Sequence, residues 1–314
     1  MKLWVGVTDG DWYELLASQP TLEEVNFWQP GGGQEFKALA PGALFLFKLH
    51  SPRNFVVGGG VFAHWSRLPL SLAWETFGIA NGATSLSEMR RRVGKYRRGA
   101  TDDREDSPIG CILLEQPFFF PRDRWIPAPA DWKPNIVQGK GYALDSILGR
   151  RLWEDVRDRL ERAPPALGER PLDERATGEP VARFGEPTLV RPRLGQGTFR
   201  VLVTDAYERR CAITRERTLP ALEAGHIRPY SEQGEHAVSN GLLLRRDLHA
   251  LFDRGYLTVT PELRLAVSRR IRQDFENGRD YYALDGREVW VPSQLGAKPD
   301  PRHLAWHNEN RYLA

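Results

Sequence analysis

Cysteine is scarce in this chain, which has only Cys111 and Cys211 among its 314 residues. Neither cysteine has a second one two residues away, and we assign the two to different halves of the chain. Disulfide frameworks and cysteine-rich zinc sites need several closely spaced cysteines. The sequence therefore predicts neither, and no structural zinc is expected.

Long apolar runs are also missing. No run approaches the roughly 18 residues that a membrane-spanning helix needs, and the mean hydropathy is −0.49. At the N-terminus, Asp9 and Asp11 come before any apolar run long enough for a signal peptide. We expect a cytoplasmic protein without a membrane partner.

Neither sign of charge dominates. The 44 Lys and Arg residues stand against 41 Asp and Glu residues, which gives a net charge of +3 and a pI near 8.9. This balance permits a nucleic acid as partner without requiring one. A chain of this length is longer than one hydrophobic core usually supports, so two domains with a connector are expected.

Residues 1–145 have the pattern of short strands broken by glycine and proline turns. Apolar runs cover residues 43–49, 55–63 and 109–120, which is typical of a twisted sheet or a small barrel. Two helices are expected within it, at residues 11–18 and 86–97. The second begins after Ser85 and carries a basic face of Arg90, Arg91, Arg92, Lys95 and Arg97.

A connector is predicted over residues 146–194. It starts with a helix at about residues 144–162, whose apolar stripe includes Leu148, Leu152 and Val156. Residues 163–192 are rich in proline, glycine and charge and have few aromatics. Such a composition cannot bury enough surface to fold alone, so we expect a flexible linker.

The third segment, residues 195–314, begins with a predicted helix at 198–209. An extended piece at 211–214, a strand near 221–227, a strand near 240–245 and a helix near 246–254 follow. The expected order is strand, loop, strand, helix.

Three residues in this segment have the chemistry of a hydrolytic site. His226 closes the first strand, Asn240 follows it after a loop, and His249 lies on the helix with Asp253 four residues on, so on the same helix face. Phosphodiester hydrolysis needs a base, a cation and a group that orients the base. His226 suits the base, His249 and Asp253 can bind a divalent ion, and Asn240 can hold the imidazole or brace the loop.

Taken singly, these residues have ordinary explanations, because a lone histidine is often structural and a helical His/Asp pair is often a solvated ion pair. Together they resemble the HNH endonuclease family, with its ββα-metal finger, over about residues 195–270. The resemblance implies His226 as general base, Asn240 as the middle asparagine and His249 as a ligand of one divalent metal, Mg²⁺, Mn²⁺ or similar. It is carried by Cys211-Ala-Ile-Thr214, Glu223-Ala-Gly-His226-Ile, Asn240-Gly-Leu-Leu-Leu and Leu248-His249-Ala-Leu-Phe-Asp253-Arg-Gly255.

The chain departs from the family pattern in two places. Many members have Asp or His before the base as a second metal ligand, where this chain has Gly225, and many have paired cysteines where it has Cys211 with Thr214. Glu223 lies on the same strand face as Gly225, so it is a candidate ligand alongside Asp253. Candidate phosphate contacts, for which a plain surface role is the alternative, are Arg228, Arg245, Arg246 and Arg254.

The first segment resembles the PUA-like superfamily, which includes the EVE and ASCH domains. The residues that carry the resemblance lie at 27–30, 39–42 and 54–62. The resemblance implies a small barrel that holds a flipped or modified base between aromatic walls, approached over a basic surface. Core packing and turn capping are the alternatives for its candidates, which are the aromatic Trp12, Phe27, Trp28, Trp65 and Trp74 and the polar Asn54, His64 and Asn81.

The sequence thus predicts an α+β protein with an N-terminal PUA-like small β-barrel with helices and a C-terminal HNH ββα-metal finger. The expected function is a modification-dependent, type IV-like restriction endonuclease that cuts double-stranded DNA with one divalent metal and a histidine base. Because one HNH site cuts one strand, a double-strand break implies a homodimer or two successive nicks. The alternatives are a sequence-specific HNH restriction enzyme on unmodified DNA and a non-catalytic nucleic-acid-binding protein.

Overall fold

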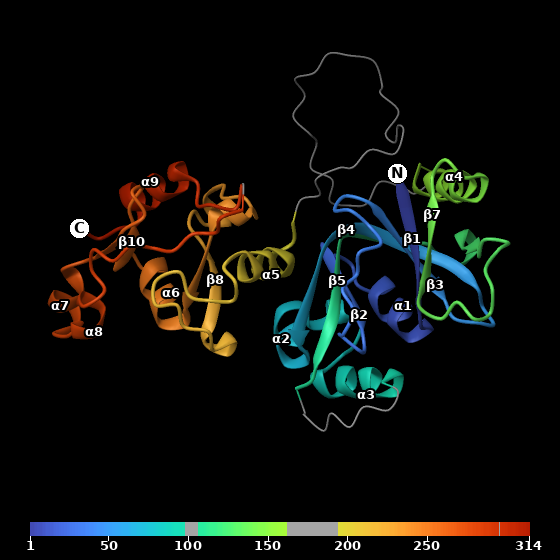
Figure 1. Cartoon of the computed structure of the whole chain (residues 1–314), viewed down its shortest axis with the longest axis horizontal. Helices are drawn as coiled ribbons and strands as arrows, with labels where there is room; N and C mark the ends of the chain where they lie inside the picture. The colour runs from blue at the N-terminus through green and yellow to red at the C-terminus, as the bar shows by residue number, and fades with distance from the viewer. Residues whose placement is uncertain (98–105, 162–193, 295) are drawn as a thin grey trace, which may run out of the picture. The chain divides into compact units, whose positions relative to one another are not determined.

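The computed structural model describes residues 1–97, 106–161, 194–294 and 296–314 (Figure 1). The chain divides into two compact units, Met1–Pro192 and Arg193–Ala314, which are described separately below. The flexible linker expected at residues 163–192 lies outside the described residues.

The first unit is built on one seven-stranded sheet. Six of its strands follow the order β2-β5-β4-β3-β1-β7, and the seventh, β6, pairs with β4. β1 and β3 are parallel, and the other pairs are antiparallel. The strands are β1 (Lys2–Thr8), β2 (Glu24–Gln29), β3 (Leu44–Leu49), β4 (Phe55–Pro69), β5 (Pro108–Phe119), β6 (Ile126–Pro127) and β7 (Gly139–Ala143).

The expectation of a closed barrel is wrong for the described residues. Closure would require hydrogen bonds between the terminal strands of the path, yet β2 pairs only with β5 and β7 only with β1. Register shifts occur on both sides of β4, after Phe47 of β3 and around Val61 and His64 of β4 itself. Such irregularities bend and twist a sheet, and here they curve it without joining its edges.

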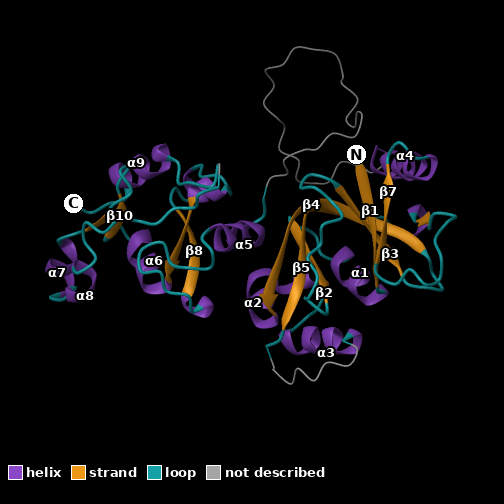
Figure 2. Ribbon diagram, viewed as in Figure 1, coloured by secondary structure: helices purple, strands orange, loops and turns teal. Residues whose placement is uncertain are grey.

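Helices cover both faces of this sheet (Figure 2). On one face, Phe45 and Phe47 pack against Trp12 and Leu16 of α1. On the other, Leu46 packs with residues of α4. The helices are α1 (Gly10–Ala17), α2 (Leu70–Phe77), α3 (Leu86–Tyr96) and α4 (Ile147–Glu161), with the 3-10 turns η1 (Gly78–Asn81) and η2 (Arg122–Arg124).

The helix expected at the start of the connector is α4, and it packs on the sheet of the first unit. Its buried residues Leu152 and Val156 share a core with Leu3, Val5 and Tyr142. The apolar stripe predicted from the sequence is thus buried against the sheet, so the helix is part of the first unit's core.

The second unit contains the predicted strand, loop, strand and helix in that order. α5 (Gln196–Ala206) precedes β8 (Leu222–His226), and β8 pairs antiparallel with β9 (Gly241–Arg245), which leads directly into α6 (Arg246–Asp253). The remaining elements are η3 (Leu219–Ala221), η4 (Tyr230–Glu232), η5 (Val238–Asn240), β10 (Leu257–Val259), β11 (Leu265–Val267), α7 (Arg270–Phe275), α8 (Arg279–Tyr282) and α9 (Pro301–Asn310).

The extended piece expected at 211–214 is instead a turn. The Arg215 N–H donates to the carbonyl of Cys211 at 3.0 Å, and the Thr214 N–H points at its sulfur at 3.5 Å. Cys211 is fully buried in the core. A buried thiol with local hydrogen bonds favours a tight turn over a strand, because the turn satisfies these backbone groups.

None of the helices within the described ranges has the length and apolar character that crossing a membrane demands.

The N-cap of α3 gives a first prediction. The Ser85 hydroxyl accepts from the Glu88 N–H at 3.1 Å, and the Glu88 carboxylate accepts from the Thr84 N–H at 2.7 Å. We expect Ser85→Ala to lower the free energy of unfolding of the first unit by about 1 kcal/mol, measured by urea denaturation. Ser87→Ala is the control, since Ser87 is exposed inside the same helix. An equal effect of both changes would contradict a capping role.

Candidate functional site

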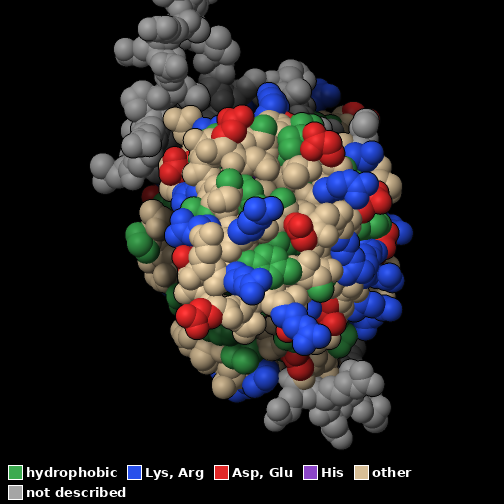
Figure 3. Space-filling view, turned by 90° about the vertical axis from the view of Figure 1, so that its left-hand side faces the viewer, with side chains coloured by type: hydrophobic (Ala, Val, Ile, Leu, Met, Phe, Trp, Pro, Cys, Tyr) green, Lys and Arg blue, Asp and Glu red, His purple; other side chains and the backbone are tan. Residues whose placement is uncertain are grey.

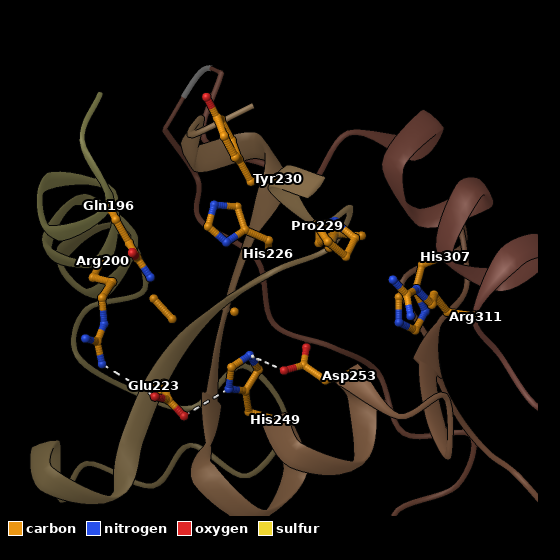
Figure 4. A pocket seen from close by; sticks show the side chains of 13 residues that line it. Gln196, Arg200, Glu223, His226, Pro229, Tyr230, His249, Asp253, His307 and Arg311 are labelled. Carbon is orange, nitrogen blue, oxygen red and sulfur yellow. Dashed lines mark hydrogen bonds and ion pairs between the residues drawn. The ribbon is translucent and has the colours of Figure 1, made fainter. Parts of the chain in front are cut away.

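A cavity of about 380 Å³ opens in the second unit, where β8, α5, α6 and the turn after β8 meet (Figure 4). Four of the predicted site residues, Glu223, His226, His249 and Asp253, line it, together with residues from α9 and its C-terminal end. The lining side chains include Gln196, Arg200, Glu223, His226, Tyr230, His249, Asp253, His307 and Arg311.

His226 is the last residue of β8 and stands opposite Gly241 of β9. Its ring stacks on Phe199 of α5, with 3.9 Å between centroids and 12° between planes. A Cβ at Gly241 would lie 2.5 Å from Val203 Cγ2 and 3.1 Å from the Phe199 ring, so the glycine leaves room for α5 to pack here. Burial, with the nearby His236 and His249, lowers the pKa of His226 to about 4. The imidazole is therefore neutral at pH 7 and able to accept a proton.

Asn240 is fully buried and braces the loop after β8. Its Oδ1 accepts from the Arg228 N–H at 2.9 Å, and its Nδ2 donates to the carbonyls of Arg228 and Glu235, both at 2.9 Å. Of the two roles that the sequence left open, holding the imidazole or bracing the loop, the observed hydrogen bonds are those of the brace.

His249 lies between two carboxylates that approach opposite ring nitrogens. Its Nδ1 is 3.0 Å from Glu223 Oε2, and its Nε2 is 3.4 Å from Asp253 Oδ2. A histidine that binds a metal through one nitrogen commonly donates the other N–H to a carboxylate. Glu223, expected as a metal ligand, is therefore placed to orient the imidazole instead, whereas Asp253 lies on the side of Nε2.

The ionisation of Glu223 agrees with its place as the hydrogen-bond acceptor of His249. Burial alone would raise its pKa, but the hydrogen bond with His249 and the positive charges of His249 and Arg200 lower it overall. Arg200 forms an ion pair with Glu223 at 3.5 Å between Nη2 and Oε1. Glu223 is thus ionised at neutral pH, the state in which it accepts the Nδ1–H of His249.

Gly225 occupies the place where many HNH sequences have a second ligand. A Cβ at this position would lie 2.3 Å from both Cδ2 and Nε2 of the His249 ring. The ring thus fills the volume that a side chain at 225 would need. The His249 ring can take this position because residue 225 has no side chain.

The donor set next to this glycine fits a divalent cation only in part. Among the residues that the structure describes, no group of three or more His, Cys, Asp and Glu side chains is arranged to hold a metal. The imidazole Nε2 of His249 and the half-exposed carboxylate of Asp253 nevertheless form a nitrogen and oxygen pair on the wall of the cavity. Such a pair can bind one divalent ion whose other positions are left to water and phosphate oxygens.

Two residues beside the predicted histidines were missed from the sequence, and one of them, Arg200, lines the cavity. His236, in the loop after β8, has its Nδ1 2.9 Å from His226 Nε2. Arg200 brings a cation from α5, which lies before the motif in the chain. The only signal for Arg200 was its place beside Phe199 on the expected helix, and His236 had none, because loop spacing does not fix side-chain direction.

The four arginines proposed to contact phosphate are not among the residues that line this cavity. Arg245 is held by an ion pair with Asp247, and Arg254 donates to the Ala250 carbonyl at 2.9 Å. Arg228 donates to the Glu232 carbonyl, and its guanidinium lies over the Trp306 ring at 5.3 Å. Arg246 is exposed on α6. The cations that line the cavity are Arg200 and Arg311.

A second cavity, of about 580 Å³, lies in the first unit. Seven aromatic side chains contribute to its walls, beside glycines, other apolar residues and polar groups. Of the predicted pocket residues, Trp12, Phe27 and Trp28 line it. The other lining side chains include Trp4, Phe36, Phe45, Tyr96, His50, Thr8, Asp9, Gln29, Gln34 and Gln138.

Three residues proposed for the base pocket lie elsewhere. Trp65 donates from Nε1 to Gln29 Oε1 at 3.0 Å without lining the cavity. Asn54 accepts from the Lys48 ammonium at 2.8 Å, and Trp74 lies on α2, outside the lining residues. Because successive strand residues face opposite sides, a short list of aromatics read from the sequence cannot tell which face each takes.

The remaining polar candidates of the first unit also serve the fold. Asn81 is fully buried and donates to the carbonyls of Ala73 and Gly78, and His64 is half-buried on β4. On α3, Arg92 pairs with Glu88 at 2.6 Å, while Arg90 and Arg91 are exposed. Lys95 lies over the ring of Tyr96, a residue that lines the cavity.

Comparisons with known proteins bear on both units. Residues 211–260 match the family model described as HNH endonuclease, so this segment is an HNH endonuclease segment and the chain is an endonuclease. A search of curated proteins finds no significant match.

Among solved structures, the chain is similar to the ASCH protein from Zymomonas mobilis, at 14% identity and a TM-score of 0.33, over 48% of this chain and 94% of that one. It is also similar to the modification-dependent TagI restriction endonuclease, at 24% identity and a TM-score of 0.25. This match covers 35% of the present chain and 36% of the TagI chain.

The contact between Gly225 and His249 gives a second prediction. In Gly225→Ala the added Cβ would overlap the imidazole of His249, so the ring must leave its present position. We expect cleavage of DNA to fall by about 100-fold, the scale on which ångström displacements act, measured as a single-turnover rate. Gly94→Ala is the control, since a Cβ there meets nothing within 4 Å. Unchanged cleavage by Gly225→Ala would show that the ring position does not matter.

The buried His307 gives a third prediction. Its nitrogens lie 2.8 Å from Thr258 Oγ1 and 3.2 Å from the Phe252 carbonyl, and burial lowers its pKa to about 4. The unfolded chain, with an ordinary pKa near 6.5, binds more protons between pH 6.5 and 4. Stability of the second unit is therefore complete above pH 6.5 and falls as pH drops toward 4.

His307→Gln removes this titrating group. We expect its loss of unfolding free energy between pH 7 and 4 to be smaller than that of the wild type by about 2–3 kcal/mol, measured by urea denaturation at each pH. Identical pH slopes for the two proteins would contradict the assignment.

Proposed function

We propose that this endonuclease is a modification-dependent restriction enzyme that hydrolyses double-stranded DNA. In this proposal, residues 195–314 form the nuclease domain and residues 1–145 form a domain that senses a modified base. One observation carries the nuclease part: within the HNH segment, neutral His226 and the His249 and Asp253 pair line the same cavity.

In the proposed reaction, His226 accepts a proton from water. The water oxygen forms a bond to phosphorus, the bond from phosphorus to the leaving oxygen breaks, and that oxygen takes a proton from solvent. His249 and Asp253 would hold one divalent ion, Mg²⁺ or Mn²⁺, which supplies charge stabilisation for the phosphate. Glu223 keeps the His249 ring in place, and Arg200 and Arg311 offer guanidinium groups to phosphate oxygens on the same wall.

The aromatic cavity supports the sensing part of the proposal. Its volume of about 580 Å³ is ample for a flipped nucleobase, and Trp28 and Phe27 offer ring faces for stacking. Lys95, which lies over the ring of the lining residue Tyr96, offers positive charge to the DNA backbone beside the cavity, and Arg90 and Arg91 are exposed on the same helix. In this reading, Trp65, Trp74 and Asn54 support the fold.

Basic side chains are also plentiful on the second unit. On the face drawn in Figure 3, Lys and Arg gather along one side with Asp and Glu between them. A surface of this kind positions a duplex through its phosphates without reading sequence. Because the unit has one cavity of HNH residues among those described, we propose that a double-strand break arises from a homodimer or from two successive nicks.

The fourth prediction tests this function directly. Matched DNA duplexes carry 5-methylcytosine, 5-hydroxymethylcytosine, N6-methyladenine, a phosphorothioate or no modification, and each is incubated with Mg²⁺ or Mn²⁺. We expect cleavage of at least one modified duplex and none of the unmodified one. His226→Ala should lose about 1,000-fold or more in rate, within the range for removal of a general base, at an unchanged melting temperature.

Trp28→Ala separates sensing from cutting, because it alters the aromatic cavity and leaves the HNH residues intact. We expect it to bind the cleaved duplex more weakly. Cleavage of unmodified DNA in a fixed pattern would instead identify a sequence-specific enzyme. Equal inertness of wild type and His226→Ala on every duplex with both metals would identify a non-catalytic binding protein.

A further inference from the structure

The second histidine beside His226 has no role in the mechanism above. His236 lies in the loop between η4 and η5, and its Nδ1 is 2.9 Å from Nε2 of His226. Among the described residues, the His226 side chain makes this one hydrogen bond, through Nε2. Its other ring nitrogen, Nδ1, has no hydrogen bond to a described residue. In Figure 4 the ring of His226 stands above His249 and Asp253.

The position of His236 is built by its surroundings. Tyr230 stacks on its ring, with 4.7 Å between centroids and 10° between planes. The next residue toward the N-terminus, Glu235, is tied through its carbonyl to the buried Asn240 side chain at 2.9 Å. The same asparagine also holds both backbone groups of Arg228, at the other end of the loop. These contacts therefore hold the ring of His236 next to the ring of His226.

We propose that His236 is a positioning residue that fixes the orientation and the tautomer of the His226 imidazole. This inference rests on the proposed function, in which His226 is the base. The hydrogen bond of one ring nitrogen decides which nitrogen carries the proton in a neutral histidine. With His236 Nδ1 as acceptor, the proton of His226 sits on Nε2. Its Nδ1 then keeps a lone pair for the attacking water.

The proton balance of this arrangement is simple. Nδ1 of His226 takes the proton of the water whose oxygen bonds to phosphorus, and His226 becomes an imidazolium. Its Nε2–H stays donated to His236 Nδ1, which spreads part of the new charge over a second ring without moving another proton. His226 later returns the Nδ1 proton to solvent. Phe199, stacked on the face of His226, keeps the ring from rotating out of this geometry.

An imidazole differs from a carboxylate as the orienting group. A carboxylate on Nε2 would raise the pKa of His226 through its negative charge, and the ring of His236 brings no negative charge. The site thus gains orientation without a charge that would hold His226 protonated. Glu223, a carboxylate that lines the cavity, hydrogen-bonds to His249 instead.

Two substitutions at 236 separate the hydrogen bond from the packing. His236→Phe keeps a ring for Tyr230 to stack on and removes the nitrogen, whereas His236→Asn keeps a side-chain polar atom close to the place of Nδ1. On a cleaved duplex we expect His236→Phe to lower kcat by about 10- to 100-fold, the effect of losing an orienting partner of a catalytic group, with KM changed less than about twofold. His236→Asn should regain part of the lost kcat.

His303→Phe is the matched control, because His303 is a half-buried histidine of α9 that does not line the cavity. It should cleave like the wild type. A wild-type kcat in His236→Phe, with His226→Ala inactive, would overturn the positioning role and leave the proposed function intact. Cleavage by His226→Ala would instead overturn the proposed function itself.

A measurement without substitution covers the case in which the variants fail to fold. Nitrogen-15 NMR of the histidine rings in the intact protein at pH 7 reports which nitrogen carries the proton. We expect His226 to be protonated at Nε2 and bare at Nδ1. The opposite tautomer would refute the inference, whatever the activity of the variants.

Discussion

The antiparallel pairing of β8 and β9 is the constraint on which the candidate site depends. It sets His226 opposite Gly241 and continues from β9 straight into α6, so that the His249 ring comes to rest against the bare Cα of Gly225. A shift of one residue in this register would turn His226 to the other face of the ribbon. Every further contact of the site, from the Phe199 stack to the Glu223 hydrogen bond, presupposes this register.

The polar groups of the site are arranged so that each imidazole has a distinct electrostatic task. His226 is buried against aromatic rings and another histidine, which keeps it neutral and basic at pH 7. His249 is flanked by carboxylates, which suits a cation. The side chain of Asn240 hydrogen-bonds to the backbone of the loop that carries His236. Chemistry and support are thus divided between side chains that lie within one short stretch of the chain.

The cavity of the first unit is formed in a different way. Its sheet turns aromatic side chains toward α1, and the cavity forms where Trp12, Phe27 and Trp28 leave space bounded by polar groups. Ring faces bind flat molecules with little dependence on their exact hydrogen-bonding edge, while the surrounding glutamines and Asp9 offer donors and acceptors.

The sequence by itself determined the order of strand, loop, strand and helix around the site, because this order follows from local periodicity. It also proposed His226, Asn240 and His249 as site residues, from their places in that order and from the resemblance to HNH endonucleases. Tertiary structure decided the rest. It turned Glu223 toward Nδ1 of His249, placed His236 against His226 and Arg200 in the wall of the cavity, left Trp65 and Trp74 out of the aromatic one, and kept the sheet open. Loop conformation, strand face and sheet closure depend on contacts between residues far apart in the chain, and no local pattern carries that information.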